Sequence, residues 1–457
     1  MEPKQDNILK GKITSLLLSF SAPAIIGMVV GALYNIVDTI FVGRSSGALA
    51  IAALSIVFPI QLIMMSVGTM IGVGGASVIS RSLGNKNPQR AARTLGSGVI
   101  LNLLFSGTLV VLSYIFMDQL LIFFGASDQV MVYARQYMGI ILIGLFFFSF
   151  SITGNNFIRA EGSPRASMYL MIIGATANIV LDFLFIFVFG MGIRGAAIAT
   201  VISQGLSCAY ILAYYLRGKN FVKIDISCFR FRPGLMKEIM GVGLPSFIRS
   251  SMSSVIILIF NRALGYYGND LYIAVMGIGF RMLSLIQMPI IGINQGFSTI
   301  ASFNYGAQLH ARVKMVLAIS TIWVTAIGAA GAIGVLVFTR QLLGLFSNSP
   351  LLINMGINPL RITMTFLPFL GLQIIGGGLF QAIGKPAPAL IITMLKQFLF
   401  LIPAILGLPL ILGLKGVWLS IPVAEFLAII VTLVWVFKEV GTFNRKINYQ
   451  RIKTQEG

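Results

Sequence analysis

Residues 14–42 read TSLLLSFSAPAIIGMVVGALYNIVDTIFV, an apolar run with one charged side chain, Asp38. The hydrocarbon core of a bilayer is about 30 Å thick, and an α-helix needs about 20 apolar residues to cross it. The run continues too far beyond the basic residues Lys10 and Lys12 to be the apolar part of a cleaved signal peptide. This stretch therefore predicts a first transmembrane helix.

The rest of the 457-residue chain has the same character. Hydrophobic residues make up 57% of it and charged residues 10%, and the mean hydropathy is +0.92. Because soluble domains carry about a quarter charged residues, this composition excludes an ordinary soluble enzyme. Cys208, Cys228 and the single histidine, His310, provide no disulfide framework, no multi-histidine metal site and no usual Ser–His dyad. We therefore expect a membrane protein that is not an enzyme.

Reading the chain with a 20-residue window predicts twelve transmembrane helices. Their ranges are 14–42, 50–82, 92–116, 131–159, 166–189, 193–216, 236–266, 271–302, 312–338, 354–381, 388–412 and 415–437. The net charge of +20 comes from Lys and Arg that lie between these apolar runs. A nucleic-acid binder gathers them on a polar face instead, so no nucleic-acid partner is expected.

The distribution of Lys and Arg among the loops predicts the orientation, since basic loops stay in the cytoplasm. They gather after the second span, after the sixth span and in the C-terminal tail. The main residues are Arg81, Lys86, Arg90, Arg93, Arg217, Lys219, Lys223, Arg230, Arg232, Lys237, Lys438, Arg445, Lys446, Arg451 and Lys453. We therefore expect a multi-pass protein of the plasma membrane with both termini in the cytoplasm.

The two halves of the chain resemble each other when one is shifted by 222 residues. Glycine and proline recur in order at this offset, the pairs being Pro23/Pro245, Gly74/Gly296, Gly84/Gly306, Gly162/Gly384 and Pro164/Pro386. Each half holds six spans, an even number, so both halves enter the membrane from the same side. Parallel repeats of this kind are typical of alternating-access transporters.

The predicted fold is an all-α integral membrane protein with twelve transmembrane helices in two pseudo-symmetric six-helix lobes around a central cavity. The expected domains are an N-terminal lobe, 1–216, a cytoplasmic connector, 217–235, a C-terminal lobe, 236–437, and a cytoplasmic basic tail, 438–457. Prolines inside the spans are expected to allow bends. They are Pro23, Pro59, Pro245, Pro289, Pro368 and Pro403.

Acidic residues inside spans are functional candidates, because a charge in hydrocarbon is costly. Asp38 and Asp182 both fall in the outer half of the first lobe, as do Asn178, one turn before Asp182, and Thr200. Tyr34 shares a helix face with Asp38. Two carboxylates, an amide and a hydroxyl are oxygen ligands that suit Na⁺ or a shared proton. The alternative is that neighbouring helices satisfy both carboxylates, which then only hold the bundle together.

The second half has no counterpart of Asp38 or Asp182, but it has basic residues in its spans. For Arg249 and Arg361, snorkelling to the interface is the favoured explanation. Arg281 and Lys396 are instead expected to make the cavity wall of this lobe positive and to favour a substrate with an anionic part. For Glu425 in the last span, a functional role and helix pairing are equally supported.

Four motifs resemble the multidrug and toxic compound extrusion (MATE) family over nearly the whole chain. They are Ala22-Pro23 followed by Tyr34-Asn-Ile-Val-Asp38-Thr-Ile-Phe-Val-Gly43, then Ser80-Arg-Ser-Leu-Gly84, Arg159-Ala-Glu-Gly162-x-Pro164 and Ala301-Ser-Phe-Asn-Tyr-Gly306-Ala. The resemblance implies two six-helix lobes and efflux of diverse amphipathic compounds, driven by Na⁺ or H⁺.

By this resemblance, Asp38, Asn178, Asp182 and Thr200 match the family's first-lobe cation or proton site. They would be metal ligands only if the coupling ion is Na⁺. Tyr34, Tyr137 and Asn155 match residues near that site or lining the first-lobe cavity, although simple packing explains Tyr137 and Asn155 equally well. The chain lacks the second-lobe acidic residues of one family branch, so coupling is expected in the first lobe alone.

The leading functional hypothesis is a cation-coupled antiporter that exports amphipathic drugs or other organic compounds by alternating access. The expected partners are membrane lipid and the small-molecule substrate, the expected state is a monomer, and no cofactor is expected beyond the coupling ion, H⁺ or Na⁺. The alternative is a flippase for a lipid-linked or amphipathic anion. The basic residues of the second lobe favour the flippase, and twelve rather than fourteen spans count against it.

Overall fold

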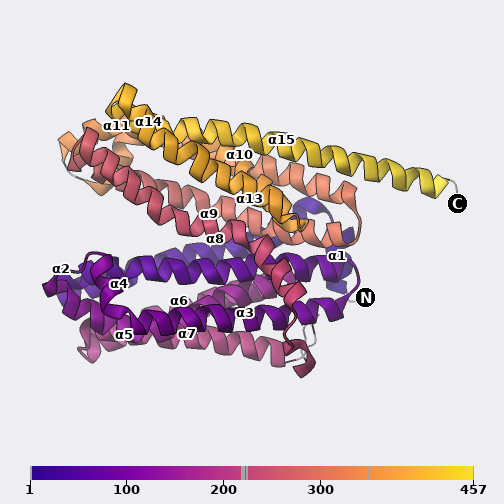
Figure 1. Ribbon diagram of the computed structural model, residues 1–457, viewed down its shortest axis with the longest axis horizontal. Coiled ribbons are helices and arrows are strands. Elements are labelled where there is room, and N and C mark those ends of the chain that lie inside the picture. Colours follow the sequence, from indigo (N-terminus) through magenta and orange to yellow (C-terminus); the bar gives the residue numbers. More distant parts are fainter. Residues whose placement is uncertain (1–2, 218–221, 223–224, 348, 456–457) are drawn as a thin grey trace. The chain divides into compact units, whose positions relative to one another are not determined.

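The computed structural model describes residues 3–217, 222, 225–347 and 349–455 (Figure 1). Every regular element among these residues is a helix. The first half contains α1 Pro3–Lys10, α2 Ile13–Gly84, α3 Pro88–Ile115, α4 Met117–Phe123, α5 Asp128–Ala160, α6 Pro164–Asp182, η1 Phe183–Val188, α7 Gly192–Leu216 and η2 Ile226–Phe229. The second half contains α8 Pro233–Tyr267, α9 Asp270–Gly306, α10 His310–Phe346, α11 Pro350–Met364, α12 Leu367–Ala382, α13 Pro386–Met394, η3 Leu395–Leu401, α14 Ile402–Leu412 and α15 Leu414–Gln455.

Eleven described helical segments are long and apolar enough to cross a membrane, and the bent pair α11 and α12 gives a twelfth span if the pair is counted as one. Helix α2 contains the first two spans, Ile13–Ser45 and Leu49–Gly84. Between them Gly47 has φ 75° and ψ −169°, a conformation that glycine adopts without a steric penalty. The all-helical membrane fold expected from the sequence is therefore confirmed.

The tenth span is broken rather than continuous. Helices α11 and α12 meet at an angle of 41°, and Pro368 lies at the start of α12. Proline cannot donate a backbone hydrogen bond and disfavours helical geometry at the residue before it. Among the other prolines expected to allow bends, Pro245 and Pro289 lie inside single helices, α8 and α9.

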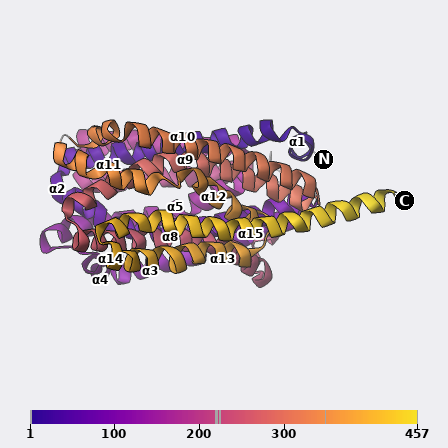
Figure 2. The ribbon, with the colours of Figure 1, turned by 90° about the horizontal axis from the view of Figure 1, so that it is seen from above.

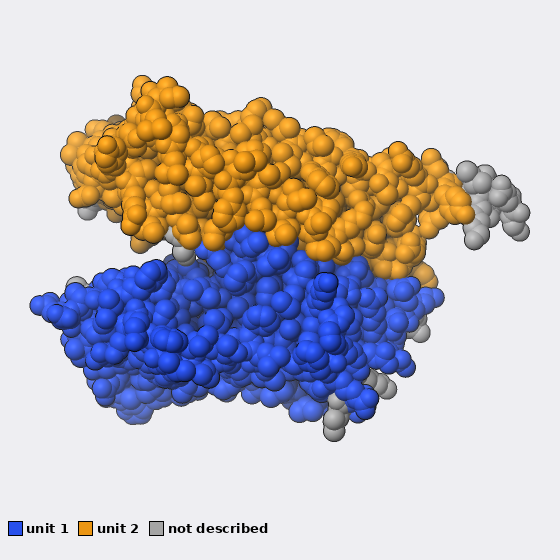
Figure 3. Space-filling view, viewed as in Figure 1, with its two compact units in different colours: residues 1–5, 26–251 blue, residues 6–25, 252–457 orange. Residues whose placement is uncertain are grey.

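The described chain forms two compact units (Figure 3). Each unit has its own buried apolar core. The first unit contains Ile26–Ser251, and the second contains Asp6–Ile25 with Met252–Gly457. Compared with the predicted lobes, the first turns of α2 belong to the second unit and the first turns of α8 to the first.

Close packing at two glycines explains which unit the first turns of α2 and of α8 join. In the first unit, a Cβ on Gly243 of α8 would collide with the carbonyl oxygen of Met70 in α2. In the second unit, a Cβ on Gly296 of α9 would lie 2.6 Å from Oγ of Ser21 in α2. Without side chains at these two positions, the helix backbones approach each other closely, so each helix end packs into the unit that supplies its neighbour.

The internal repeat is visible in the backbone and in the hydrogen bonds. Oγ of Ser80 donates to the carbonyl of Ala160 at 2.9 Å, and Oγ of Ser302 donates to the carbonyl of Ala382 at 2.9 Å. Among the described residues, the non-glycine residues with positive φ are Lys86 and Gln308, one in each half. These pairs share the 222-residue offset, so the two halves use the same local construction.

Helix α15 is 42 residues long and packs along α14 in the second unit (Figures 1 and 2). The residues of the expected basic tail continue α15, which runs without a break to Gln455. Lys219 and Lys223 of the expected connector lie outside the described residues.

Candidate functional site

The structure brings Asp38 and Asp182 together inside the first unit. Asp38 lies in the first part of α2, and Asp182 is the last residue of α6, just before the π-helical segment η1. Their carboxyl groups are near enough to interact with each other. Oδ1 of Asp38 and both carboxyl oxygens of Asp182 are buried and accept no hydrogen bond from a described donor. The pair is therefore left with acceptor oxygens and no donors.

Asn178 and Thr200 extend this arrangement. Asn178 lies one turn before Asp182 and is 1% exposed, and its Nδ2 donates to Oγ1 of Thr200 at 3.3 Å. Its Oδ1 is buried without a hydrogen-bond partner. Since the donor group is used on Thr200, the amide offers its oxygen as another free acceptor beside the carboxyl pair.

The unpaired oxygens define what the site can hold. Within the described part of the chain, no Lys or Arg lies within ion-pair distance of Asp38 or Asp182. Two neighbouring carboxylates repel each other unless a proton or a cation lies between them. Carboxylate and carbonyl oxygens are ligands of hard cations, so the residues present fit Na⁺ as well as a proton.

A pocket of about 430 Å³ opens beside the carboxyl pair, lined by both tyrosines expected near it. Its polar lining consists of Tyr34, Asn35, Asp38, Gln61, Tyr137, Thr200 and Gln204. Nε2 of Gln61 donates to the hydroxyl of Tyr137 at 3.3 Å. A cavity with one carboxyl group and several hydrogen-bonding side chains can orient an amphipathic molecule.

Gln61, Gln204 and Asn35 line the pocket but were not predicted from the sequence. Gln204 could have been found because it lies one turn after Thr200 and so shares its helix face. Asn35 follows Tyr34 directly, and Gln61 lies two residues after Pro59 inside an apolar run. Apart from Tyr34, Asn178, Thr200 and the residues singled out by the family resemblance, no site role was predicted for uncharged polar residues within the spans, although such residues also mark helix interfaces and cavities.

Asn155 and Arg281 lie apart from this pocket. Nδ2 of Asn155 donates to the carbonyl of Ser167 at 2.9 Å, and its Oδ1 accepts from Arg159 at 3.1 Å. The first bond holds α5 against α6 and the second lies within α5, so both ends of the amide are used. Arg281 belongs to α9 of the second unit, where its side chain is exposed.

Lys396 does not provide the free positive charge expected of it, and Glu425 is not isolated. Nζ of Lys396 donates to Oε1 of Glu425 at 2.6 Å and to Oε1 of Gln373 at 2.6 Å. The ion pair joins η3 to α15, so the positive charge of Lys396 is compensated. The expectation of a positive wall built by Lys396 was wrong, because a carboxylate 29 positions away in sequence folds against it.

Comparison with known proteins points to one group. The sequence pattern of the MatE family matches twice, at residues 23–184 and 245–406, which repeats the 222-residue offset. The multidrug export protein MepA of Staphylococcus saprophyticus is 29% identical over 94% of this chain and 94% of its own length. MepA of Staphylococcus aureus is 28% identical over the same shares.

Two solved structures are similar over almost their full lengths. A MATE protein in complex with MaD3S has 27% sequence identity and a TM-score of 0.90, covering 97% of this chain and 100% of that one. An outward-facing multidrug resistance MATE transporter of the MOP superfamily has 26% identity and a TM-score of 0.89, covering 96% and 98%. The likeness therefore extends across both repeats.

Proposed function

Because this chain belongs to the MatE family of multidrug and toxic compound extrusion transporters, we propose that it is a secondary-active antiporter. In this proposal it exports amphipathic organic compounds in exchange for H⁺ or Na⁺. The observation that carries the proposal is the carboxyl pair of Asp38 and Asp182, which has buried, unpaired oxygens next to a pocket.

Coupling follows from competition within the first unit. Asp38 both approaches Asp182 and lines the pocket, so an ion or proton held by the pair changes the charge that a bound compound meets. Loading of the pair from outside would weaken binding of the compound, and release of the ion into the cytoplasm would restore it. Alternating access by two lobes then links the two fluxes.

The proposal also covers the membrane in which the protein lies and its orientation there. The chain is a multi-pass membrane protein, and its basic loops support a plasma-membrane transporter with both termini in the cytoplasm. We propose that it works as a monomer. The flippase alternative is not favoured, since Lys396, one of the two basic residues that suggested it, is paired with Glu425.

The decisive experiment measures efflux of a fluorescent amphipathic dye from proteoliposomes under an imposed pH or Na⁺ gradient. We expect Asp38→Asn to abolish gradient-driven flux while dye binding to the purified protein is retained, because the amide cannot exchange a proton or balance a cation. Asp128→Asn, a matched change at an exposed carboxylate at the start of α5, should transport like the unaltered protein. Undiminished flux in Asp38→Asn would remove the pair from the mechanism.

The same vesicles separate the two coupling ions. A proton-coupled protein responds to a pH gradient in Na⁺-free buffer, whereas a Na⁺-coupled protein responds to a Na⁺ gradient at equal pH on both sides. A response to neither gradient would contradict antiport itself.

A further inference from the structure

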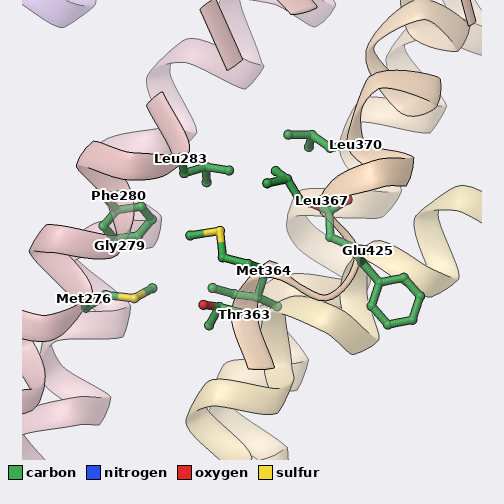
Figure 4. Close-up of a pocket in the computed structure, with 11 residues that line it drawn as sticks. Met276, Gly279, Phe280, Leu283, Thr363, Met364, Leu367, Leu370 and Glu425 are labelled. Carbon is green, nitrogen blue, oxygen red and sulfur yellow. The ribbon is translucent and has the colours of Figure 1, made fainter. Parts of the chain in front are cut away.

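The second unit has a pocket of its own, at the break between α11 and α12. Its empty space is about 460 Å³ and is partly open to the outside, and side chains of α9 face those of α11 and α12 across it (Figure 4). Its lining includes Met276, Phe280, Leu283, Met364, Leu367 and Glu425. The other described residues that line it are uncharged, so Glu425 of α15 is the one charged group in this part of the lining.

The carboxylate of Glu425 is paired through only one of its two oxygens. Its Oε1 accepts from Lys396 at 2.6 Å, and the two side chains are 14% and 20% exposed. Lys396 is held in turn by Oε1 of Gln373. The other carboxyl oxygen, Oε2 of Glu425, is buried and has no hydrogen-bond partner among the described residues. The pocket therefore has one unused acceptor on an ion pair whose net charge is zero.

The zero net charge of the ion pair between Lys396 and Glu425 favours an uncharged ligand. A cation at Oε2 would be drawn to Glu425 but repelled by the ammonium group of Lys396 on the same carboxylate, and both effects are strong away from water. It would also lose its hydration on entering an apolar pocket. An uncharged molecule with one N–H or O–H donor meets neither cost. Methionine and phenylalanine side chains such as Met276, Met364 and Phe280 pack well against aromatic rings.

We propose that this pocket binds uncharged aromatic compounds that carry one N–H or O–H group, with Oε2 of Glu425 as the acceptor. The first unit, with its unpaired carboxyl groups, takes the charged species, and the second takes neutral ones. That the bound compound is then exported rests on the proposed function. Binding itself does not rest on it.

The test uses N-phenyl-1-naphthylamine, a neutral dye with one N–H group whose fluorescence rises in apolar surroundings. It is titrated into the purified protein in lipid nanodiscs, and the signal of empty nanodiscs is subtracted. Its N-methyl derivative, which lacks the donor, is the matched probe. We expect the N–H compound to bind about tenfold more tightly or better, the value of a hydrogen bond to a charged group. Equal affinity of the two probes would overturn the proposal.

Two substitutions on α9 locate the site. Leu283→Trp fills the pocket and should remove the saturable signal. Leu285→Trp makes the same change at a side chain that is 60% exposed and should leave binding unchanged. Persistence of binding in Leu283→Trp, or its loss in both variants, would contradict the assignment.

The double variant Lys396→Met/Glu425→Leu tests the acceptor without leaving a charge unpaired. It should bind both probes with similar affinity, so that the preference for N–H is lost. Asp38→Asn separates this proposal from the transport proposal, because it should lose gradient-driven efflux but keep the probe preference. If Asp38→Asn transports normally while the probe preference holds, the proposed coupling fails and the pocket assignment stands.

Discussion

The carboxyl group of Glu161 lies in the short connection between α5 and α6, outside the spans on either side. It is 0% exposed, and neither of its oxygens accepts a hydrogen bond with ordinary geometry from a described donor. Burial raises the pKa of Glu161 to about 8, and the nearby hydroxyl of Tyr215 opposes this only in part. Glu161 is therefore mostly protonated in the folded protein at neutral pH.

This protonation makes stability depend on pH. A raised folded-state pKa means that the folded protein binds more protons than the unfolded chain between about pH 4.5 and pH 8, so stability falls as pH rises through this range. We expect the loss of unfolding free energy between pH 5 and pH 8 to be smaller in Glu161→Gln than in the unaltered protein, by on the order of 1 kcal/mol or more. Thermal unfolding from pH 5 to pH 9 measures it, with Asp128→Asn as control. Parallel pH profiles for Glu161→Gln and the unaltered protein would contradict it.

The ion pair of Lys396 and Glu425 leads to a second prediction, which concerns the stability of variants at these two residues. Removing one partner by Glu425→Leu or Lys396→Met leaves a charge without its counterion, and we expect a loss of about 3 kcal/mol in the free energy of unfolding. The double variant should recover most of that loss, because both charges leave together. Denaturant unfolding of all four proteins gives the coupling energy, and additive losses would show that the pair has no mutual stabilisation.

At the scale of helices, contacts through glycine decide which helix ends pack together. Gly243 of α8 has no room for a Cβ against the carbonyl of Met70, whereas a Cβ on Gly234 of the same helix meets no atom within 4 Å. Substitution by alanine should therefore destabilise the protein at Gly243 but not at Gly234.

We expect Gly243→Ala to lower the free energy of unfolding by about 1–3 kcal/mol, since overpacking forces the backbones apart. Gly234→Ala should be neutral or stabilising by up to about 1 kcal/mol, because alanine loses less conformational freedom on folding. The thermal unfolding midpoints of the two variants provide the comparison. A tolerated Gly243→Ala would show that α2 and α8 separate at little cost.

The helices themselves could be predicted from the sequence because each span needs a long apolar run. Their interruptions could not be predicted, since Pro368 breaks the tenth span while Pro245 and Pro289 lie within single helices. Whether a proline breaks a helix depends on neighbouring packing, which one sequence does not contain. In the candidate site, depth in the membrane placed Asp38 near Asp182 correctly. Depth alone could not reveal that Lys396 reaches Glu425, because depth says nothing of which way a side chain points.

At the scale of the whole chain, duplication leaves equivalent contacts in two separate units. Ser80 and Ser302 are each 1% exposed, and each donates to the carbonyl of the residue 80 positions later. The sequences around the two serines differ, but the hydrogen bond that each serine makes is equivalent.

We expect Ser80→Ala and Ser302→Ala each to cost about 1 kcal/mol in unfolding free energy, the net value of one buried hydrogen bond. The double variant should cost the sum, because the sites lie in different units and share no partner. Ser55→Ala, which removes an exposed bond within one helix, should change stability by less than about 0.5 kcal/mol. A double variant far from additive would mean that the two units unfold in an energetically coupled way.

The length of α15 has a practical consequence for imaging this protein. A helix of 42 residues measures roughly 60 Å at about 1.5 Å per residue, twice the thickness of the apolar layer of a bilayer. A globular marker joined to it in continuous helical register would be displayed rigidly outside the detergent belt. Particle alignment in electron cryomicroscopy, which a protein with few features beyond the micelle makes difficult, would then have a fixed landmark.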